Sequence, residues 1–256
     1  MSRPRTYKTE CIVLKQLSLS EADRILTLYT PDMGKVRAVA RGVRRPKSKL
    51  SGHLELLNQA SVSLSYGRNL DTINEAQSIR SFRGIREDLQ RISKAIYMAE
   101  LVDGFSIENS DNYQLYLLLV DSLGWLERTD NTKLLLRYFE LHLLEHSGYR
   151  PELVNCVECR AWLEPGDHFF AGGSGGVLCP ECRVDSEDSL IPISLNSMKV
   201  LRFLQREKGF ANIDVLSVPP DQLAVLERLI RVYIRYLVER DLKSAEFMNL
   251  ISNARS

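Results

Sequence analysis

Two Cys-x-x-Cys pairs constrain this chain more than any other feature. Cys156 and Cys159 form the first pair, Cys179 and Cys182 form the second, and 19 residues separate them. Each pair can aim two thiolates at one ion, so the intervening segment closes a tetrahedral zinc site. Four cysteines fill the coordination shell and leave no position for water. The pattern therefore predicts one structural Zn2+ per chain and no catalytic metal.

The residues around the pairs support a metal site. Cys11 stands far from them, which is typical of metal binding and not of a disulfide framework. His168 is a possible substitute ligand, but four thiolates are already available, and we expect this histidine at the surface. Residues 151–188 are too few for a core of their own, so metal binding should supply much of the free energy that folds them.

Residues 1–81 alternate apolar and polar side chains in the manner of β-strands, with turn residues between the runs. Five strands in so short a stretch predict a small closed barrel. The oligonucleotide-binding (OB) fold is the common barrel of this size that binds single strands. The expected strands are Cys11–Leu14, Arg24–Tyr29, Lys35–Ala40, Ala60–Tyr66 and Leu70–Ile73.

After Gly84 the apolar period becomes helical. The fold class expected is α+β and multidomain: an N-terminal OB-type barrel (1–81), an all-α domain (82–150 and 189–250) and a zinc module (151–188) inserted in it. The expected helices are Asp88–Ser106, Tyr113–Glu127, Thr132–Ser147, Asn196–Lys208 and Asp221–Leu242.

The net charge of +1 conceals an uneven distribution. Residues 1–80 carry 14 Lys and Arg against 7 Asp and Glu, a balance of +7, and the rest of the chain carries −6. Such asymmetry indicates that the first part meets a polyanion. The basic run between Gly34 and Glu55 predicts a DNA-binding surface, and a solvated charged face is the alternative. The predicted DNA-binding residues are Lys35, Arg37, Arg41, Arg44, Arg45, Lys47 and Lys49. Tyr29 and Tyr66 are candidates for stacking on bases, with packing in the barrel core or on the surface as the equally favoured alternative.

His142, Glu145 and His146 spell the H-x-x-E-H pattern of one metallopeptidase class. Apolar residues surround nearly the whole of this predicted helix, however, which favours a buried helix with core histidines. On the last long helix, Arg228, Arg231 and Arg235 form a stripe. Pairing with Glu227 and Glu239 is the favoured interpretation of that stripe, with a second phosphate-binding face as the alternative.

The chain lacks the glycine-rich phosphate loops and the serine elbow of common enzymes. We therefore expect a protein that is not an enzyme. No apolar run approaches the roughly 18 residues of a membrane span, and the apolar run near the N-terminus is too short for a signal peptide. These features predict a cytoplasmic protein, and the expected DNA binding would make it nucleoid-associated.

Three segments resemble the bacterial RecO family of recombination mediators. They are Glu21–Thr30 with Gly34-Lys35, Ala40–Ser48, and Gly148–Leu153 leading into Cys156. The resemblance covers nearly the whole chain. It implies a non-enzymatic DNA repair factor of the RecF pathway that binds single- and double-stranded DNA and anneals complementary strands. It also implies contacts with RecR and with the C-terminal tail of the single-strand binding protein, and help in loading RecA.

An acidic tail needs a locally basic groove in the acidic remainder of the chain. Candidate basic residues there are Arg86, Arg91, Lys94, Lys133 and Arg137. Two other functional classes remain open. One is an RNA-binding factor built from the barrel and the zinc module; the other is a zinc peptidase using His142, Glu145 and His146.

Overall fold

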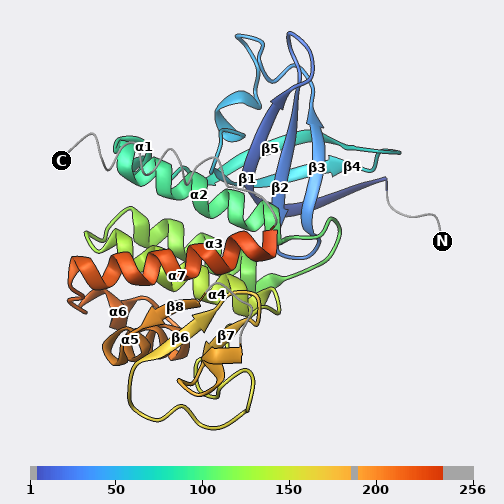
Figure 1. Ribbon diagram of the computed structural model, residues 1–256. Helices are drawn as coiled ribbons and strands as arrows, with labels where there is room; N and C mark the ends of the chain where they lie inside the picture. The colour runs from blue at the N-terminus through green and yellow to red at the C-terminus, as the bar shows by residue number, and fades with distance from the viewer. Residues whose placement is uncertain (1–4, 186–189, 239–256) are drawn as a thin grey trace. The chain divides into compact units, whose positions relative to one another are not determined.

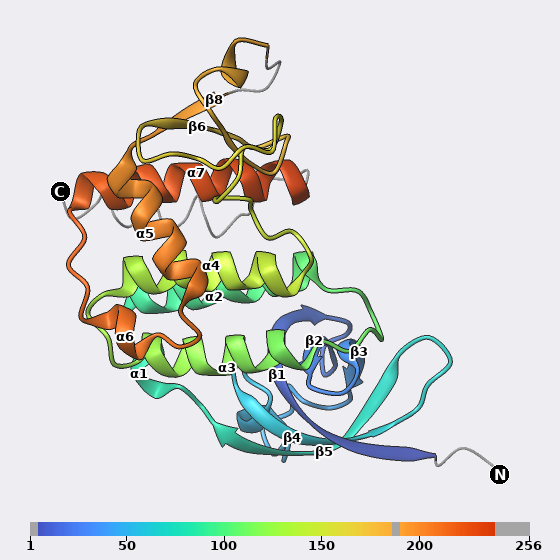
Figure 2. The ribbon, with the colours of Figure 1, turned by 90° about the horizontal axis from the view of Figure 1, so that it is seen from below.

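The computed structural model describes residues 5–185 and 190–238, which form two compact units (Figures 1 and 2). The first unit ends at Arg128 and the second begins at Thr129. The elements of the first unit are β1 (Thr6–Ser18), β2 (Arg24–Thr30), β3 (Gly34–Ala40), η1 (Ser51–His53), β4 (Gln59–Ser65), β5 (Asp71–Arg80), α1 (Arg83–Arg86), α2 (Leu89–Phe105) and α3 (Tyr113–Leu126).

The five strands of the first unit close on themselves in the order β1-β2-β3-β5-β4. Most neighbours are antiparallel, and the parallel pairing of Ala38 with Asp71 closes the ring. Inward-facing residues such as Val13, Leu28 and Val62 form the core, as the period of two predicts. The class is α+β with an N-terminal five-stranded sheet, in agreement with the sequence pattern.

Strands β1 and β5 are longer than the apolar runs from which they were predicted. The first half of β1, from Thr6, pairs with β4, and β5 continues along β4 to Arg80 (Figure 2). Both extensions are rich in polar residues, which the backbone ladder satisfies without burying their side chains. A pattern search for apolar residues therefore finds only the buried part of each strand.

Helices α2 and α3 pack against β1 and β2 within the first unit. Asp88 caps α2 by accepting the backbone N–H groups of Gln90 and Arg91, and Asn112 caps α3 in the same way. The structure thus groups α1 to α3 with the sheet in one compact unit. The domain boundary expected after residue 81 stays a prediction.

The segment between α2 and α3 approaches the β2–β3 turn closely. A side chain at Gly34 would place its Cβ 2.0 Å from the Ser110 carbonyl oxygen. The positive φ of 59° at this glycine also favours a residue without a Cβ. The Asn109 N–H donates to the Lys35 carbonyl at 3.1 Å. This turn therefore holds the helical segment on the barrel.

The second unit surrounds α4, which is buried along most of its length. Helices α5, α6 and α7 pack around it. The elements of this unit are α4 (Thr132–His146), β6 (His168–Ala171), β7 (Gly176–Leu178), η2 (Cys182–Asp185), β8 (Leu190–Ile193), α5 (Leu195–Arg206), α6 (Ala211–Asp214) and α7 (Pro220–Val238). The rest of the helix expected to reach Leu242 lies outside the described residues.

Helix α4 carries a buried ion pair. The Arg137 guanidinium contacts both oxygens of Glu140, at 2.7 and 2.8 Å. It also lies 3.5 Å from a carboxylate oxygen of Glu227 in α7. One hydrogen bond, the close Nε–Oε2 ion-pair contact and a second carboxylate offset the cost of burying the charge. The pair consequently links α4 to α7 through a network that no apolar pattern predicts.

The four-cysteine segment forms a three-stranded sheet, β7-β6-β8, that lies against α7 (Figures 1 and 2). The edge of the Tyr233 ring in α7 meets the Phe170 ring, with centroids 5.8 Å apart. The Tyr233 hydroxyl donates to the Tyr149 carbonyl at 3.0 Å. These short strands were not among the predicted elements, because three- and four-residue strands carry too little periodicity to be recognised.

Removal of the Glu140 carboxylate should destabilise the second unit. The Glu140→Ala variant leaves the Arg137 charge buried with only the more distant Glu227, so we expect a loss of about 3 kcal/mol. Urea denaturation measures the loss, and hydrogen exchange of the α4 amides locates it. The exposed pair Arg83–Glu87 is the control, and Glu87→Ala should change little. Equal stability of the two variants would contradict the prediction.

Candidate metal centre and nucleic-acid interface

The four cysteines predicted as ligands lie together. Their sulfur atoms are all within 4.8 Å of one another, and the Cys159 and Cys179 sulfurs are 3.9 Å apart. A disulfide requires about 2 Å, so these are free thiols. A tetrahedral zinc–thiolate site has Zn–S distances of about 2.3 Å, which places its sulfurs about 3.8 Å apart. The spacing fits a metal ion.

Local hydrogen bonds shape the first Cys-x-x-Cys turn. The Cys156 N–H donates to the Ala161 carbonyl at 2.8 Å, and the Arg160 N–H donates to the Cys156 carbonyl at 3.0 Å. Arg160 takes a left-handed conformation, with φ of 62°, to close the turn. A neighbouring pairing of Asn155 with Trp162 holds the two arms together.

The Cys156 sulfur is prepared to be a thiolate. Burial raises the pKa of this thiol, but backbone N–H groups of Cys179, Cys159 and Glu158 point at the sulfur and outweigh burial, lowering the pKa to about 6. The Cys179 N–H lies 3.4 Å from it. Because metals bind the thiolate form, these donors favour ligation at this position.

Neither His168 nor the motif of His142, Glu145 and His146 belongs to the four-cysteine cluster. Within residues 5–185 and 190–238, the one group of three or more candidate ligands is the four cysteines. His168 is buried, and its Nε2 lies 2.8 Å from the Glu164 carbonyl. The expected surface position of His168 is therefore wrong, because this imidazole pairs with the backbone inside the module.

His142, Glu145 and His146 take the arrangement of core residues. The Nε2 atom of His142 lies 3.0 Å from the Leu204 carbonyl oxygen. A carbonyl accepts only, so this nitrogen carries the proton and offers no lone pair to a metal. In addition, burial lowers the pKa of His142 from its ordinary value. The structure supplies no third ligand for a peptidase site among the described residues.

Two of the predicted DNA-binding residues are engaged within the first unit. The Lys35 ammonium is 15% exposed and donates to the backbone and side chain of Asp103, at 2.7 and 3.2 Å. The Arg37 guanidinium lies 4.0 Å from the Glu108 carboxylate. These carboxylates come from the end of α2 and the segment after it. Carboxylates therefore lie beside both basic side chains of β3.

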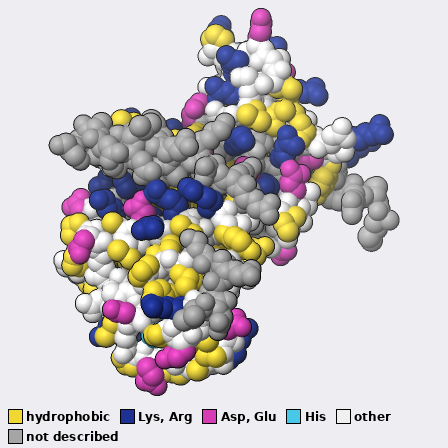
Figure 3. Space-filling view, in the orientation of Figure 1, with side chains coloured by type: hydrophobic (Ala, Val, Ile, Leu, Met, Phe, Trp, Pro, Cys, Tyr) yellow, Lys and Arg dark blue, Asp and Glu magenta, His cyan; other side chains and the backbone are white. Residues whose placement is uncertain are grey.

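The other five predicted residues remain on an exposed loop. They are Arg41, Arg44, Arg45, Lys47 and Lys49. None of them forms an ion pair with a carboxylate of the described residues. Figure 3 shows Lys and Arg side chains gathered around the loops at the upper end of the barrel.

Backbone hydrogen bonds to the β1–β2 turn anchor the base of this loop. The Gly42 N–H donates to the Asp23 carboxylate at 2.7 Å, and the Arg44 N–H donates to the Ala22 carbonyl. This backbone bond is the first cause of the lowered pKa of Asp23, and Arg45 and Arg41 contribute. The Arg44 guanidinium also donates to the Ser20 carbonyl at 3.4 Å, so exposed basic side chains extend from an anchored turn.

The two candidate stacking residues differ in exposure. Tyr29 is 1% exposed and is therefore excluded as a base-stacking residue. Burial also raises the pKa of its hydroxyl. Tyr66 is 53% exposed at the end of β4. The sequence alternation could not separate them, because both lie at strand ends.

Most of the basic residues considered for an acidic tail have internal roles. Arg86 donates to the Leu56 carbonyl and the Asn58 side chain, and Arg91 donates to the Leu126 carbonyl. Lys94 is buried beside Gln90. Arg137 belongs to the buried pair described above. Lys133 is the exposed member of the set.

The arginine stripe of α7 is partly paired, as expected from its spacing. Arg231 donates to Glu227 one turn away. Arg228 and Arg235 are exposed. Glu239, the other expected partner, lies outside the described residues.

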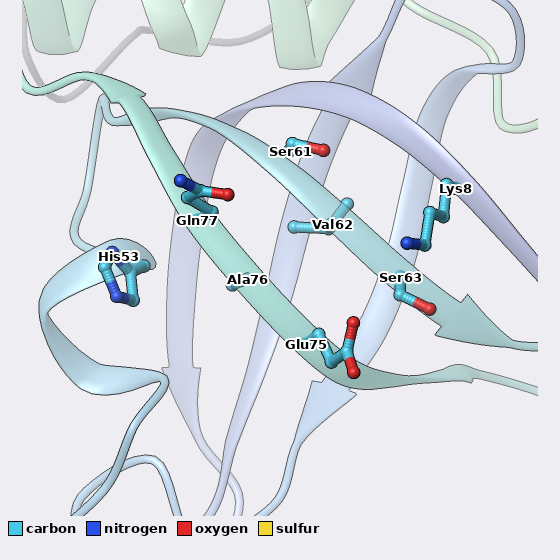
Figure 4. A pocket seen from close by; sticks show the side chains of 8 residues that line it. All are labelled: Lys8, His53, Ser61, Val62, Ser63, Glu75, Ala76 and Gln77. Carbon is cyan, nitrogen blue, oxygen red and sulfur yellow. The ribbon is translucent and has the colours of Figure 1, made fainter.

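A hollow of about 480 Å³ lies on the outer face of β4 and β5 (Figure 4). Serine hydroxyls and an amide line it, together with Lys8 and Glu75. One positive and one negative group cancel, so this surface does not suit a polyanion. No described helix is long and apolar enough to cross a membrane.

The site and fold together define a class: a small five-stranded sheet with an exposed basic loop, joined to helices that carry a four-thiolate centre. Models of two protein families match this chain, "Recombination protein O N terminal" over residues 1–82 and "Recombination protein O C terminal" over residues 86–246. The chain belongs to the RecO family.

Curated relatives agree over nearly the full length. A protein of Dehalococcoides mccartyi is 42% identical over 254 residues, covering 99% of each chain. Proteins of Roseiflexus sp. (38%, 96% of this chain and 86% of the relative) and Symbiobacterium thermophilum (37%, 97% and 99%) are also similar. Each of these relatives is named DNA repair protein RecO.

We expect purified protein to contain about one tightly bound metal ion per chain. Cys156→Ser should lower the metal content and expose the module to proteolysis, because metal binding and folding are coupled there. Elemental analysis and limited proteolysis measure both effects.

Cys11→Ser is the matched control. This thiol is buried in the barrel core, and burial raises its pKa to about 12. The variant should keep its metal. Metal retained after a double change of Cys179→Ser and Cys182→Ser would show that other ligands hold the ion.

Proposed function

We propose that this protein is a DNA repair and recombination mediator that acts without a catalytic group. It binds single- and double-stranded DNA and anneals complementary strands. It works with RecR to help load RecA onto DNA coated by the single-strand binding protein, whose C-terminal tail it contacts. Family membership and the relatives' names support the repair role.

The observation that carries the DNA-binding proposal is the exposed loop with five basic residues and no paired carboxylate. We assign the closed sheet to the OB fold, since it has five strands in a compact, mostly antiparallel ring. The loop that follows β3 then lies beside the β1–β2 turn, to which Arg44 and Gly42 tie it. Loops of this barrel type are where oligonucleotides bind.

Annealing follows from charge neutralisation. Two complementary strands repel each other through their phosphates, and a basic loop that covers phosphates lowers this repulsion. The bases stay accessible and pair without further help. The loop is anchored by backbone bonds, so little conformational entropy is lost when it binds.

We assign the four-thiolate centre to Zn2+. Soft thiolate ligands in a tetrahedral arrangement favour zinc over magnesium or calcium. Cys156, Cys159, Cys179 and Cys182 would hold the ion and keep the module folded against α7. A filled thiolate shell leaves no site for water, so the ion's role is structural.

We place the tail-binding site in the helical part of the chain. The acidic tail needs exposed positive charge, and four of the five basic residues considered for it are engaged internally. Lys133 in α4 is therefore the candidate contact within that set.

The triple variant Arg44→Ala, Arg45→Ala, Lys47→Ala tests the DNA surface. If about five residues contact single-strand phosphates, log affinity against log salt has a slope of about −3.5, and removing three flattens it by about 2. We also expect the triple variant to lose annealing of strands coated by single-strand binding protein. Fluorescence anisotropy across a salt series measures the slope.

The variant Lys133→Ala, Lys199→Ala, Lys208→Ala is a control of equal charge. These lysines are exposed on the second unit, and the slope should stay unchanged. Lys35→Ala should also leave the slope nearly unchanged, because Asp103 already neutralises that ammonium. An unaltered slope in the Arg44, Arg45 and Lys47 variant would refute the assignment. Preference for RNA without annealing would favour the RNA-binding alternative.

A further inference from the structure

Two aromatic rings meet where β4 ends and β1 begins. The centroids of Tyr7 and Tyr66 are 4.6 Å apart, and the ring planes are inclined by 35°. Tyr7 packs against the barrel core, whereas Tyr66 is 53% exposed. One ring therefore supports the other and leaves aromatic surface open to solvent. Tyr66 is the stacking candidate that stays exposed, and its support by Tyr7 has no part in the site described above.

Hydrogen bonds hold the pair in place. The Tyr7 hydroxyl donates to one oxygen of Asp71 at 2.5 Å, and the Gly67 N–H donates to the other at 2.9 Å. The Tyr66 N–H donates to the Arg5 carbonyl at 3.3 Å. A single carboxylate thus fixes both the supporting ring and the turn that follows the exposed ring. Such pre-organisation reduces the entropy lost when a ligand stacks there.

The surroundings of the pair are basic. Arg5 and Arg68 are exposed on either side in the chain. The Asp71 carboxylate is already occupied by Tyr7 and Gly67. Glu75 lies opposite Ser63 and lines the hollow of Figure 4, on the sheet face that also bears Lys8. An exposed aromatic face with an arginine two residues from each ring along the chain suits a nucleic-acid base with its phosphates.

The β4–β5 turn leads into the strand that borders the end of β3. Asp71, which ends this turn, pairs with Ala38 of β3. Two residues beyond Ala38, β3 ends and the loop beginning at Arg41 follows. The aromatic pair and the basic loop therefore border the same strand of one compact unit.

We propose that Tyr66, supported by Tyr7, is a stacking platform for a base of single-stranded DNA whose phosphates the basic loop holds. This inference rests on the proposed function. It adds a contact that requires an unpaired base. It gives the protein a preference for single strands that phosphate contacts alone do not provide.

The test uses the full chain and a labelled oligodeoxythymidine of about 16 nucleotides. Tyr66→Ala should weaken binding by about 5- to 100-fold, because a stacked base contributes that much to affinity. The salt slope should remain unchanged, since no charge is removed. Tyr66→Phe keeps the ring and should bind like the unaltered protein. Thermal melting verifies that both variants are folded.

A matched oligonucleotide of abasic sugar-phosphates separates stacking from other effects. The loss caused by Tyr66→Ala should disappear on this ligand. In addition, Tyr66→Trp should retain binding, and its added fluorescence should be quenched by the ordinary oligonucleotide and not by the abasic one. An equal loss on both ligands, or Tyr66→Ala binding within twofold of the unaltered protein, would overturn the platform.

The loop variant distinguishes the two proposals. If Tyr66→Ala binds normally while the Arg44, Arg45 and Lys47 triple variant does not, the platform is wrong and the proposed function stands. If the unaltered protein binds no oligonucleotide at low salt, both fail. Binding of a peptide or protein at Tyr66 in place of DNA would also refute the platform.

Discussion

The carboxylates that follow the barrel along the chain neutralise the basic side chains of β3. Asp103 takes the Lys35 ammonium and Glu108 lies beside Arg37, while Gly34 lets the Ser110 backbone approach the turn. These contacts join α2 and α3 to the sheet as one unit. They also occupy part of the basic run and leave available the loop from Arg41 to Lys49, which is the surface that we propose for DNA. The charge balance of residues 1–128 is +4, from 19 basic and 15 acidic residues, and it is concentrated on that loop.

In the second unit, a metal centre and a buried polar network act together. The segment around Cys156 has three short strands and little core of its own, and Tyr233 of α7 provides its main support. Helix α7 is in turn linked to α4 through Arg137 and Glu227. Loss of the metal would therefore loosen the module first, while α4 keeps its packing against α5 and α7. The absence of a water position in a four-thiolate shell agrees with a centre that builds structure.

Several site residues were predictable because their signal is local. The four cysteines lie together as the Cys-x-x-Cys spacing requires, and the exposed arginines of the loop stand in a run without acids. The prediction was wrong for His168, and for Tyr29 the structure supports the core-packing alternative over stacking. Burial depends on which elements cover a strand or turn and not on the residues beside it. The pairing of Lys35 was missed for the same reason: Asp103 lies 68 positions away in the sequence. Asp71 orients Tyr7 from 64 positions away, and no local pattern indicates this contact.

By itself, the sequence determined the five strands of the first unit, the five long helices, the clustering of the four cysteines and the sign of the charge on the barrel, because each depends on periodicity or on spacing along the chain. Only the tertiary structure decided which charges remain available, where the first compact unit ends, and which tyrosine is exposed. Those properties arise when distant segments meet: a basic residue keeps its field only if folding brings no carboxylate within ion-pair distance. For this protein, that condition holds on the loop after β3 and fails for Lys35 in β3 itself.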